Sequence, residues 1–545
     1  MKLRSFFLPA FVVVLIIAVV GGYLLFGKSS LNRSSGGVMT EPSAAIFVPR
    51  QAPAMLSLLV NPDSLEGFGR SPLDLKSLKN SLFAQSGLDY NNNIKPWLGD
   101  EVTLALTSLD YDREPENGVQ PGYLLVVQTK DVELAKEELQ LWYSKRAIAG
   151  NSDLVFEQYK GVNLIYQRPK ETDYAGTIGV SAVVGDFVIF ANHPKVLRDA
   201  INNVQAADLN LQNSPAYQDA LSTITEPRIG VAYLNIPGVS AWIGNSPSLA
   251  NLEVREMLTI ALTLKGKGLA AATALIGVAG IENQSPSLSA PVRALNYIPG
   301  QSILTAAGSN LNQFWRQVES GLKPESPLQQ VLNQAISRVN QLYQIDLPEE
   351  IFSWVTREYA FSLLPLRDGK LDWVFVAEKS GASDAGVAHL DLLAKERGLS
   401  VGGLPLLEQE MIAWTKLQTV REQVGKKGSL VSLDARISGI HTQVENYEIL
   451  SSSLEGMAAA LGEEVSLLAV PQFVEAIAVL PDANDGYLYV DWLASKPIFE
   501  AKFPLLRVVE LVGKPLFENL RSVTITSQGV SNNVRRATIF FDLQA

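Results

Sequence analysis

An uncharged apolar run near the start of the chain, residues 6–26, constrains its fold more than any other feature. The run reads FFLPAFVVVLIIAVVGGYLLF. About 20 apolar residues in a helix match the roughly 30 Å hydrocarbon core of a bilayer. The run is longer than the apolar part of a cleavable signal peptide, and no small-x-small site follows it. We therefore predict a transmembrane anchor at residues 6–26 behind a cytoplasmic tail at residues 1–5.

The rest of the chain is expected to lie outside the cytoplasm. Two basic residues precede the anchor and two follow it closely, so the positive-inside bias is slight. A single N-terminal span before one large domain usually keeps its short tail in the cytoplasm. We predict a linker at residues 27–43 and a body in a periplasm or an equivalent lumen. The absence of cysteine excludes a disulfide framework and a thiolate zinc site.

The composition indicates a globular, acidic body. Hydrophobic residues make up 47% of the chain and charged residues 19%, which allows a sizeable core. The formal net charge is −11 and the pI is near 5.1, so the body repels phosphate backbones at long range. We therefore expect no nucleic-acid partner.

Landmark residues recur in the same order along the body, which predicts an internal duplication. The offsets between matched residues lie between 250 and 261, the largest being the one between Gly268 and Gly529 near the ends of the two copies. We predict two tandem repeats, at residues 44–281 and 292–545, joined by a Ser/Pro-rich linker at residues 282–291. The matched pairs are Pro49 with Pro299, Trp97 with Trp354, Glu101 with Glu358, Tyr217 with Phe473, and Tyr233 with Tyr489.

Each repeat is expected to be an α+β domain built on an antiparallel sheet, so the predicted fold class is a transmembrane helix followed by two such domains. No G-x-G-x-x-G opens a helix after a strand, which disfavours a doubly wound nucleotide-binding sheet. Asp131 and Ser214 are expected to cap helices, and glycine turns near Gly268 and Gly529 are expected to join strand pairs. The strands are expected at residues 101–109, 122–128, 162–167, 179–191 and 228–236, and the helices at 131–150, 193–204 and 214–224.

Several segments of the first repeat carry a resemblance to a known family. They are LLVVQTKD at residues 124–131, YKGVNLIY at 159–166, VVGDFVIFANHPKVLRDAI at 183–201 and SPAYQDAL at 214–221. They resemble the family called domain of unknown function 3352, found largely in membrane-anchored proteins of cyanobacteria. The resemblance covers the chain from about residue 45 to the C-terminus, with the second repeat more diverged. It implies an anchored extracytoplasmic protein of the thylakoid or plasma membrane, and it offers no catalytic position to transfer.

The histidine inventory argues against catalysis. The chain has three histidines, His193, His389 and His441, and no two of them have a local metal-ligand spacing. His193 precedes a predicted helix and is expected to cap it or to face solvent. His389 is expected on an amphipathic helix and His441 on a strand. We assign all three to structural roles.

Adjacent acidic residues form the other possible reactive groups. Asp100–Glu101, Glu349–Glu350 and Glu463–Glu464 are neighbours in sequence, so their side chains point apart and cannot share one proton. Hydrolysis would need two carboxylates brought together by the fold. The matched acids Glu101 and Glu358 are the most economical candidates for such a pair.

Aromatic residues and a basic glycine turn also invite a functional interpretation. The lysines around Gly266 fail the phosphate-loop spacing, so we assign this segment to a hairpin. The tryptophans are mostly expected in the core; they are Trp97, Trp142, Trp242, Trp315, Trp354, Trp373, Trp414 and Trp492.

The sequence therefore predicts a membrane-anchored, extracytoplasmic binding or scaffold protein without catalytic activity, serving envelope or thylakoid assembly. Its expected partners are the lipid bilayer and an unidentified protein. No catalytic, cofactor-binding or metal-binding residue is assigned, and no cofactor is expected. Two alternatives stay open, which are an extracytoplasmic hydrolase using carboxylates joined by the fold and a carrier of a lipid or pigment.

Overall fold

The computed structural model describes most of the body of the chain. The predicted anchor at residues 6–26 and the pair Glu463–Glu464 lie outside the described part. Within residues 418–424 and 428–434 only the main chain is described. The described residues are 37–61, 90–114, 116, 118–148, 154–167, 179–222, 224, 226–244, 256–277, 288–321, 329, 333, 336–337, 340–341, 345–365, 371–406, 409–424, 428–462, 465–502, 517, 519–531 and 534–544.

Strands dominate the structure. They are β1 (Ala54–Leu58), β2 (Leu98–Ser108), β3 (Gly122–Thr129), β4 (Leu154–Tyr159), β5 (Val162–Gln167), β6 (Val180–Val184), β7 (Phe187–Ala191), β8 (Gly230–Asn235), β9 (Met257–Lys265), β10 (Gly268–Ile276), β11 (Leu304–Gly308), β12 (Tyr359–Pro365), β13 (Leu371–Glu378), β14 (Ser400–Leu406), β15 (Gln409–Val424), β16 (Gly428–Val444), β17 (Tyr447–Ser451), β18 (Gly486–Asp491), β19 (Leu520–Ser531) and β20 (Val534–Leu543).

Helices connect the strands and cover the sheet. The α-helices are α3 (Val132–Ile148), α4 (Pro194–Gln205), α5 (Pro215–Ser222), α6 (Ile236–Gly244), α7 (Leu311–Gly321), α9 (Ser383–Glu396), α10 (Leu454–Leu461), α11 (Pro471–Ile477) and α12 (Trp492–Lys502). Short 3-10 or π turns are η1 (Ser43–Ile46), η2 (Tyr90–Ile94), η4 (Ala207–Leu209), η6 (Arg293–Tyr297), η7 (Leu347–Phe352) and η8 (Leu467–Ala469).

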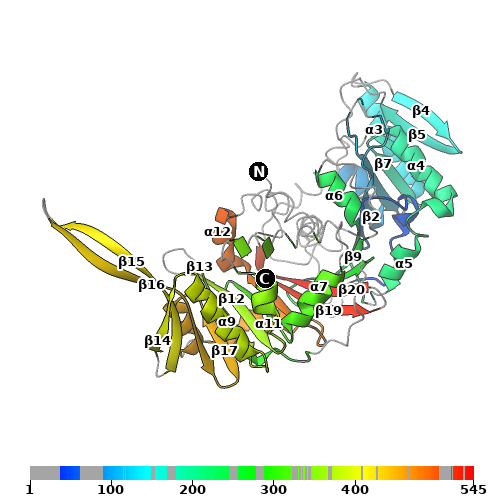
Figure 1. The fold of residues 1–545 in the computed structure, drawn as a ribbon. Helices are drawn as coiled ribbons and strands as arrows, with labels where there is room; N and C mark the ends of the chain where they lie inside the picture. Colours follow the sequence, from blue (N-terminus) through cyan, green and yellow to red (C-terminus); the bar gives the residue numbers. More distant parts are fainter. Residues whose placement is uncertain are drawn as a thin grey trace.

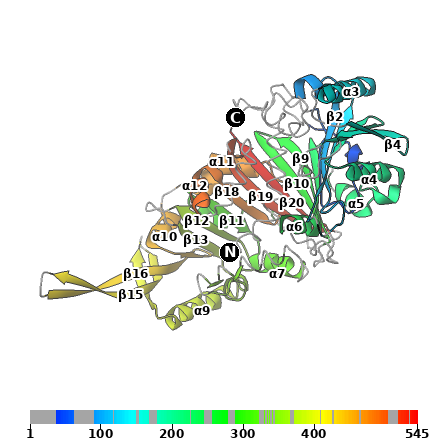
Figure 2. The same cartoon turned by 90° about the horizontal axis from the view of Figure 1, so that it is seen from above.

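The strands form one antiparallel sheet of 20 strands. Following the pairings from one edge to the middle gives β4-β5-β6-β7-β3-β2-β1-β8-β9-β10. The sheet continues from β10 as β20-β19-β18-β11-β12-β13-β17-β16-β15-β14. Figures 1 and 2 show this sheet running through the whole molecule. We call residues 37–277 the first half and residues 288–544 the second half.

The predicted fold class is therefore wrong. It proposed a transmembrane helix followed by two tandem domains, each built on its own sheet. Instead, one sheet of 20 strands extends through both halves. Across the described residues, no helix combines the length and apolar character needed to span a bilayer. The prediction failed because β10, the last strand of the first half, pairs with β20, the last strand of the second half. This pairing removes the open edge that each strand would otherwise present.

The two halves join along a seam between β10 and β20. Nine residue pairs align along it, from Gly268 opposite Asp542 to Ile276 opposite Val534. The hydroxyl of Thr273 also crosses the seam and donates to the carbonyl of Ala537 at 2.9 Å. The seam therefore combines main-chain and side-chain hydrogen bonds between segments more than 250 residues apart.

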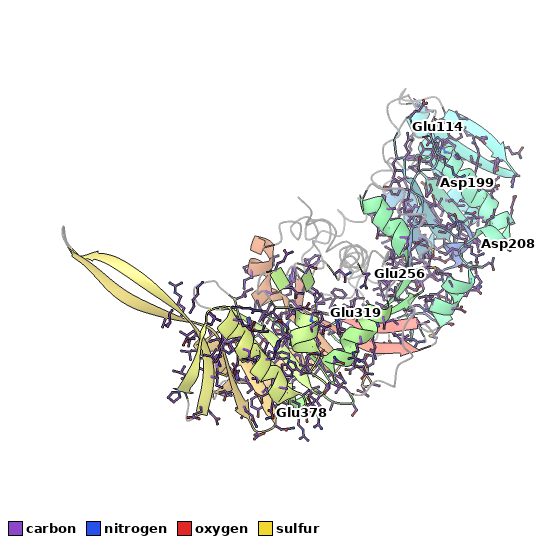
Figure 3. All side chains as sticks on the ribbon, in the orientation of Figure 1. Glu114, Asp199, Asp208, Glu256, Glu319 and Glu378 are labelled. Atoms are coloured by element: carbon purple, nitrogen blue, oxygen red, sulfur yellow. The ribbon has the colours of Figure 1, made fainter. Side chains whose placement is uncertain are left out.

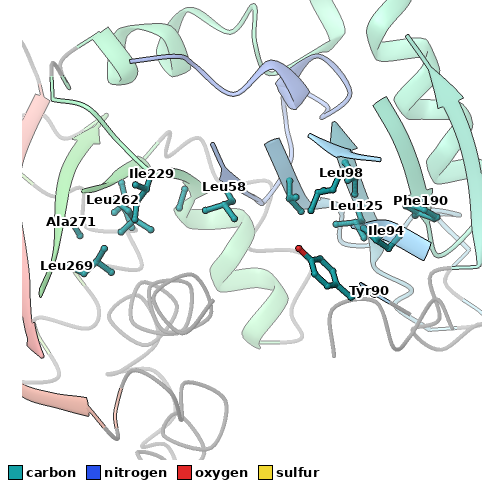
Figure 4. Packing of buried hydrophobic residues seen from close by; sticks show 14 of the residues in the cluster. Leu58, Tyr90, Ile94, Leu98, Leu125, Phe190, Ile229, Leu262, Leu269 and Ala271 are labelled. Carbon is teal, nitrogen blue, oxygen red and sulfur yellow. The ribbon is translucent and has the colours of Figure 1, made fainter. Parts of the chain in front are cut away.

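Apolar side chains pack across the same seam. Leu269 and Ala271 of β10 share a buried cluster with Phe541 of β20 and with Trp492 of α12. Figure 4 shows part of this cluster, in which residues from β1, β2, β3, β8, β9 and β10 gather on one face of the sheet. Side chains along β9 alternate between the two faces of the sheet. Every second residue therefore faces this cluster, and these residues are Leu258, Ile260, Leu262 and Leu264.

Most local predictions for the first half are confirmed. The expected strands coincide with β2, β3, β5, β6 with β7, and β8. The Asp131 side chain accepts a hydrogen bond from the amide of Leu134 at 3.0 Å, as expected of a helix cap. Pro215 is the first residue of α5, which suits its fixed φ.

The two glycine turns differ. Gly266 has a φ of 57° and lies in the tight turn between β9 and β10, which confirms the predicted hairpin. Gly529 has a φ of 76°, but it lies within β19, where the register shifts between Ser527 and Val530. Its positive φ therefore serves a bulge and not a turn.

The ends of the predicted linkers are held against the body. Val38, in the linker predicted at residues 27–43, exchanges main-chain hydrogen bonds of 2.8 and 2.9 Å with Arg228. Leu288, in the linker predicted at residues 282–291, pairs in the same way with Asn484. Each of these two described ends is therefore attached to the body by a pair of main-chain hydrogen bonds.

We predict that Gly268→Ala weakens the seam. A Cβ at this position would collide with the carbonyl oxygen of Phe541 and the ring of Phe540. Overpacking of this kind typically costs about 1–3 kcal/mol. Urea denaturation should show a lower free energy of unfolding for this variant.

Gly402→Ala is the matched control, because Gly402 also lies in a strand and a Cβ there meets nothing within 4 Å. Equal stabilities of the two variants would contradict a tightly packed seam.

Candidate functional site

Glu101, one of the two acids singled out in the sequence, is part of the fold. It lies in β2 and is 4% exposed. Its carboxylate accepts hydrogen bonds from the amides of Ser43 and Ala44, at 2.9 and 2.8 Å, and from the Thr103 hydroxyl at 3.2 Å. These bonds hold η1 against the sheet and give two amides at the start of that turn a hydrogen-bond acceptor. Burial raises the pKa of the Glu101 carboxyl, although the two amide hydrogen bonds act in the opposite direction.

Glu358 has a comparable position just before β12. Its carboxylate accepts a hydrogen bond from the amide of Arg293 at 2.8 Å, where η6 begins. The hydroxyl of Tyr447 donates to the same oxygen at 3.3 Å. Both acids therefore attach a short turn to the sheet.

The structure does not bring these two acids together. Their strands, β2 and β12, are nine positions apart in the sheet. At about 4.8 Å per strand, this is roughly 40 Å along the sheet. A glycosidase pair needs a separation of about 5–9.5 Å. Figure 3 likewise shows labelled acids spread over the molecule, from Glu114 and Asp199 in the first half to Glu378 in the second.

The adjacent acids behave as expected where they are described. Asp100 is exposed while Glu101 is buried, so their side chains point apart. Glu350 accepts a hydrogen bond from the Asp346 amide at 3.0 Å and lies 4.0 Å from Arg397.

Two of the histidines confirm their predicted roles. His193 is the N-cap of α4, and its Nδ1 accepts a hydrogen bond from the amide of Lys195 at 3.1 Å. Its ring stacks on Tyr111 with a centroid separation of 4.3 Å, and burial lowers the pKa of the imidazole. His389 lies on α9 and is exposed.

His441 belongs to a connected group of ionisable and aromatic side chains in the second half. It lies on β16, is 6% exposed, and places Nε2 3.1 Å from Oδ1 of Asp391 on α9. The same oxygen accepts the indole N–H of Trp414 at 2.6 Å. Asp391 therefore joins α9 to both β15 and β16. We call Asp391, Trp414 and His441 the α9 anchor group.

A second set of charges lies beside the α9 anchor group. Lys379 is 2.6 Å from Asp384 at the start of α9 and 3.5 Å from Glu448 on β17. Its pKa is raised, first by the hydrogen bond with Asp384, while burial raises the pKa of the Glu448 carboxyl. These contacts hold the first turn of α9 as Asp391 holds its middle.

A buried carboxylate organises the start of α10 in a similar way. Asp372 on β13 accepts hydrogen bonds from the hydroxyls of Ser452 and Ser453 and from the amide of Trp373. Ser453 is the N-cap of α10 and accepts a hydrogen bond from the Gly456 amide at 3.0 Å. The Asp372 carboxylate thus positions the residue that caps the helix.

The tryptophans mostly confirm the prediction of a core role. Trp97 and Trp354 are buried, and their indole N–H groups donate to the carbonyls of Asn93 and Glu350, four residues earlier in each case. Trp142, Trp414 and Trp492 are also buried, whereas Trp242 on α6 is exposed. The aromatic residues therefore do not define a single binding surface.

The α9 anchor group is joined by hydrogen bonds through the Asp391 carboxylate. A hydrolytic triad would require a nucleophilic hydroxyl on the other ring nitrogen of His441. In the part of the chain that is described, no hydroxyl group hydrogen-bonds to this imidazole. Nor do the described His, Asp and Glu side chains form any group of three or more that could hold a metal ion.

Comparison with known families identifies the chain. A family model described as "Protein of unknown function (DUF3352)" matches residues 7–543. The chain belongs to this family. No curated protein and no solved structure is similar enough to count as a match. The family assignment suggested by the sequence is therefore confirmed, and the DUF3352 description assigns no activity.

We predict that Asp391→Ala destabilises the second half. The substitution removes the acceptor of a buried indole N–H and the partner of His441. Loss of such a partner costs about 1–3 kcal/mol. Thermal denaturation should therefore show a lower transition temperature.

Asp384→Ala on the same helix is the control, because its carboxylate is exposed and its pair with Lys379 is worth less than about 1 kcal/mol. A control variant as unstable as Asp391→Ala would rule out the assigned role of the α9 anchor group.

We also predict a distinctive pH dependence for Glu101→Gln. The pKa of Glu101 is raised in the folded chain, so folding favours its protonated form. The stability of the wild type relative to the variant should increase as the pH falls from neutral toward the ordinary glutamate pKa of about 4.3. Urea denaturation across this range measures the difference. A difference that shrinks on acidification would contradict a carboxyl whose charge is disfavoured by burial.

Proposed function

We propose that this DUF3352 protein is a non-catalytic binding or scaffold protein that works at a membrane. The observation that supports this function is the open edge formed by β4, which pairs with β5 alone among the described strands. Phe156 on β4 is 71% exposed. An aromatic side chain on an open strand edge suits the addition of a strand from another protein.

The edge strand is held in place by a charged contact on its other side. Arg198 of α4 binds both oxygens of Glu157, at 2.8 and 2.7 Å, and Tyr166 donates to the same carboxylate at 2.9 Å. A bidentate pair fixes geometry better than a single contact. A rigid edge loses little conformational freedom when a partner strand binds, which favours recognition.

The roles of the candidate acids and histidines also support a binding function. Glu101, His193 and Asp391 use their polar atoms to hold a turn, a helix start and a helix against the sheet. Attachment to a membrane remains part of the proposal through the apolar run at residues 6–26.

We predict that a photo-crosslinking residue at Phe156 captures one protein of defined mass in native membranes. The same residue at Ile148, which is exposed at the end of α3, should give no such product. Mass spectrometry of the adducts identifies the partner and the crosslinked segment.

Equal capture at both positions, or capture at neither, would contradict binding at the β4 edge. Turnover of a glycan, peptide or ester substrate by the purified chain, lost in Glu101→Gln, would instead place the protein among hydrolases.

A further inference from the structure

The two ends of the sheet differ in how readily they accept another strand. β4 and β14 each pair with a single neighbour among the described strands, and Figures 1 and 2 show β4 at the outer edge of the first half. β14 contains Gly402, Gly403 and Pro405, and a proline has no N–H group to donate to a neighbouring strand. β4 reads LVFEQY and contains neither glycine nor proline. Of the two edges, β4 is therefore the one without a residue that blocks pairing.

The hairpin at the end of β4 determines which of its main-chain groups point outward. Tyr159 stands opposite Val162, and the two residues between them, Lys160 and Gly161, have φ values of 48° and 82°. Two positive φ values in a two-residue loop are typical of a type I′ turn, in which the closing pair of residues is hydrogen-bonded. Hydrogen-bonded and non-hydrogen-bonded pairs then alternate along the two strands. The main-chain groups that point away from β5 are therefore those at positions 154, 156 and 158.

The side chains at these three positions share one face of the sheet and are uncharged. They are Leu154, Phe156 and Gln158. Phe156 is 71% exposed and stands opposite Ile165, which packs against the buried cluster that contains Trp142 of α3. Glu157 faces the other side of the sheet, where Arg198 binds both of its carboxylate oxygens. A strand added to this edge would therefore meet an aromatic ring on one face and a neutralised carboxylate on the other.

The sequence of β4 is complementary to itself. An antiparallel pair of two β4 strands centred on Phe156 places the two Phe156 rings opposite each other and Leu154 opposite Gln158. On the other face, Glu157 stands opposite Val155, so the two carboxylates do not face each other. Like charges directly opposite one another destabilise a strand pair, whereas aromatic pairs stabilise it. This register therefore brings the aromatic rings together and keeps the acidic residues apart.

The helices near this edge leave room for a second copy. α3 covers β5 and β6, where the Tyr143 hydroxyl hydrogen-bonds to the Ile165 carbonyl and the Ser181 hydroxyl, at 2.9 and 2.8 Å. With two β4 strands paired, β5 and the β5 of a second copy would be three strand spacings apart, or about 14 Å. Packed helices lie about 8–10 Å apart, so the two α3 helices would not collide and the Phe156 rings would lie between them. α4 packs against β3, β6 and β7, further from the edge.

We propose that two copies of this chain pair through their β4 strands, with Phe156 at the two-fold axis. This inference rests on the proposed function, because it names the partner of the same edge. The six residues of β4 extend about 20 Å, so the contact is smaller than a standard protein interface and the pairing is reversible. The proposed attachment to a membrane raises the effective concentration of the two edges, which favours the pair. The photo-crosslinked product at Phe156 should then have twice the mass of the chain.

Disulfide formation tests both the pairing and its register in the full chain. The sequence contains no cysteine, so Phe156→Cys introduces a single thiol at the centre of the proposed pair. The Cα atoms of directly opposite, hydrogen-bonded residues lie about 5.5 Å apart, which is within the range of a disulfide. Mild oxidation of membranes that contain the Phe156→Cys chain should link two chains into a dimer, measured by electrophoresis without a reducing agent.

Gln158→Cys is the matched control, because Gln158 is exposed on the same face of the same strand. In the proposed register the two residues at position 158 are four residues out of step, or about 14 Å apart along the strands. Oxidation of Gln158→Cys alone should therefore give at least tenfold less dimer than oxidation of Phe156→Cys. A mixture of Gln158→Cys with Leu154→Cys should restore the link, because these two positions stand opposite each other.

The outcomes distinguish this inference from the proposed function. A Phe156→Cys chain that stays monomeric, while a photo-crosslinker at the same position captures a different protein, would overturn self-pairing and leave the binding function standing. Dimer in equal amounts from Phe156→Cys and Gln158→Cys would indicate random collision and would also overturn self-pairing. No product at position 156 in either experiment would contradict both the inference and the proposed function.

Discussion

The pairing of β10 with β20 is the contact on which the architecture depends. It joins segments from the two ends of the described body over nine residue pairs and converts two runs of strands into one sheet. The same seam carries the apolar cluster that contains Leu269, Phe541 and Trp492. Without this pairing, β10 and β20 would each have a neighbouring strand on one side only. Apolar packing at the same place adds to the stability of the contact.

Four buried or half-buried carboxylates attach turns or helices to the sheet. Glu101 and Glu358 hold short turns, Asp372 holds the cap of α10, and Asp391 holds α9. Each carboxylate is surrounded by donors, which offsets the cost of burying it. The proposed function rests instead on the open edge of the sheet at β4.

Local structure was predictable from the sequence, whereas long-range contacts were not. Alternating β-branched residues predicted β2, β3 and β8, and Asp131 and Pro215 marked helix starts, because such patterns act over a few residues. The pairing of β10 with β20 and the contact between Asp391 and His441 leave no local signal, since the partners lie 50 or more residues apart. Gly529 was predicted in a tight turn between two strands, but it lies within β19, where its positive φ serves a bulge that only the register reveals.

Hydrogen exchange of the full chain tests the central claim most directly. If β10 and β20 are interior neighbours in one continuous sheet, their amides should exchange as slowly as those of β1 and β8, which also pair on both sides. Rapid exchange in β10 and β20, with β1 and β8 still protected, would mean that the sheet ends at each half and that the account is wrong.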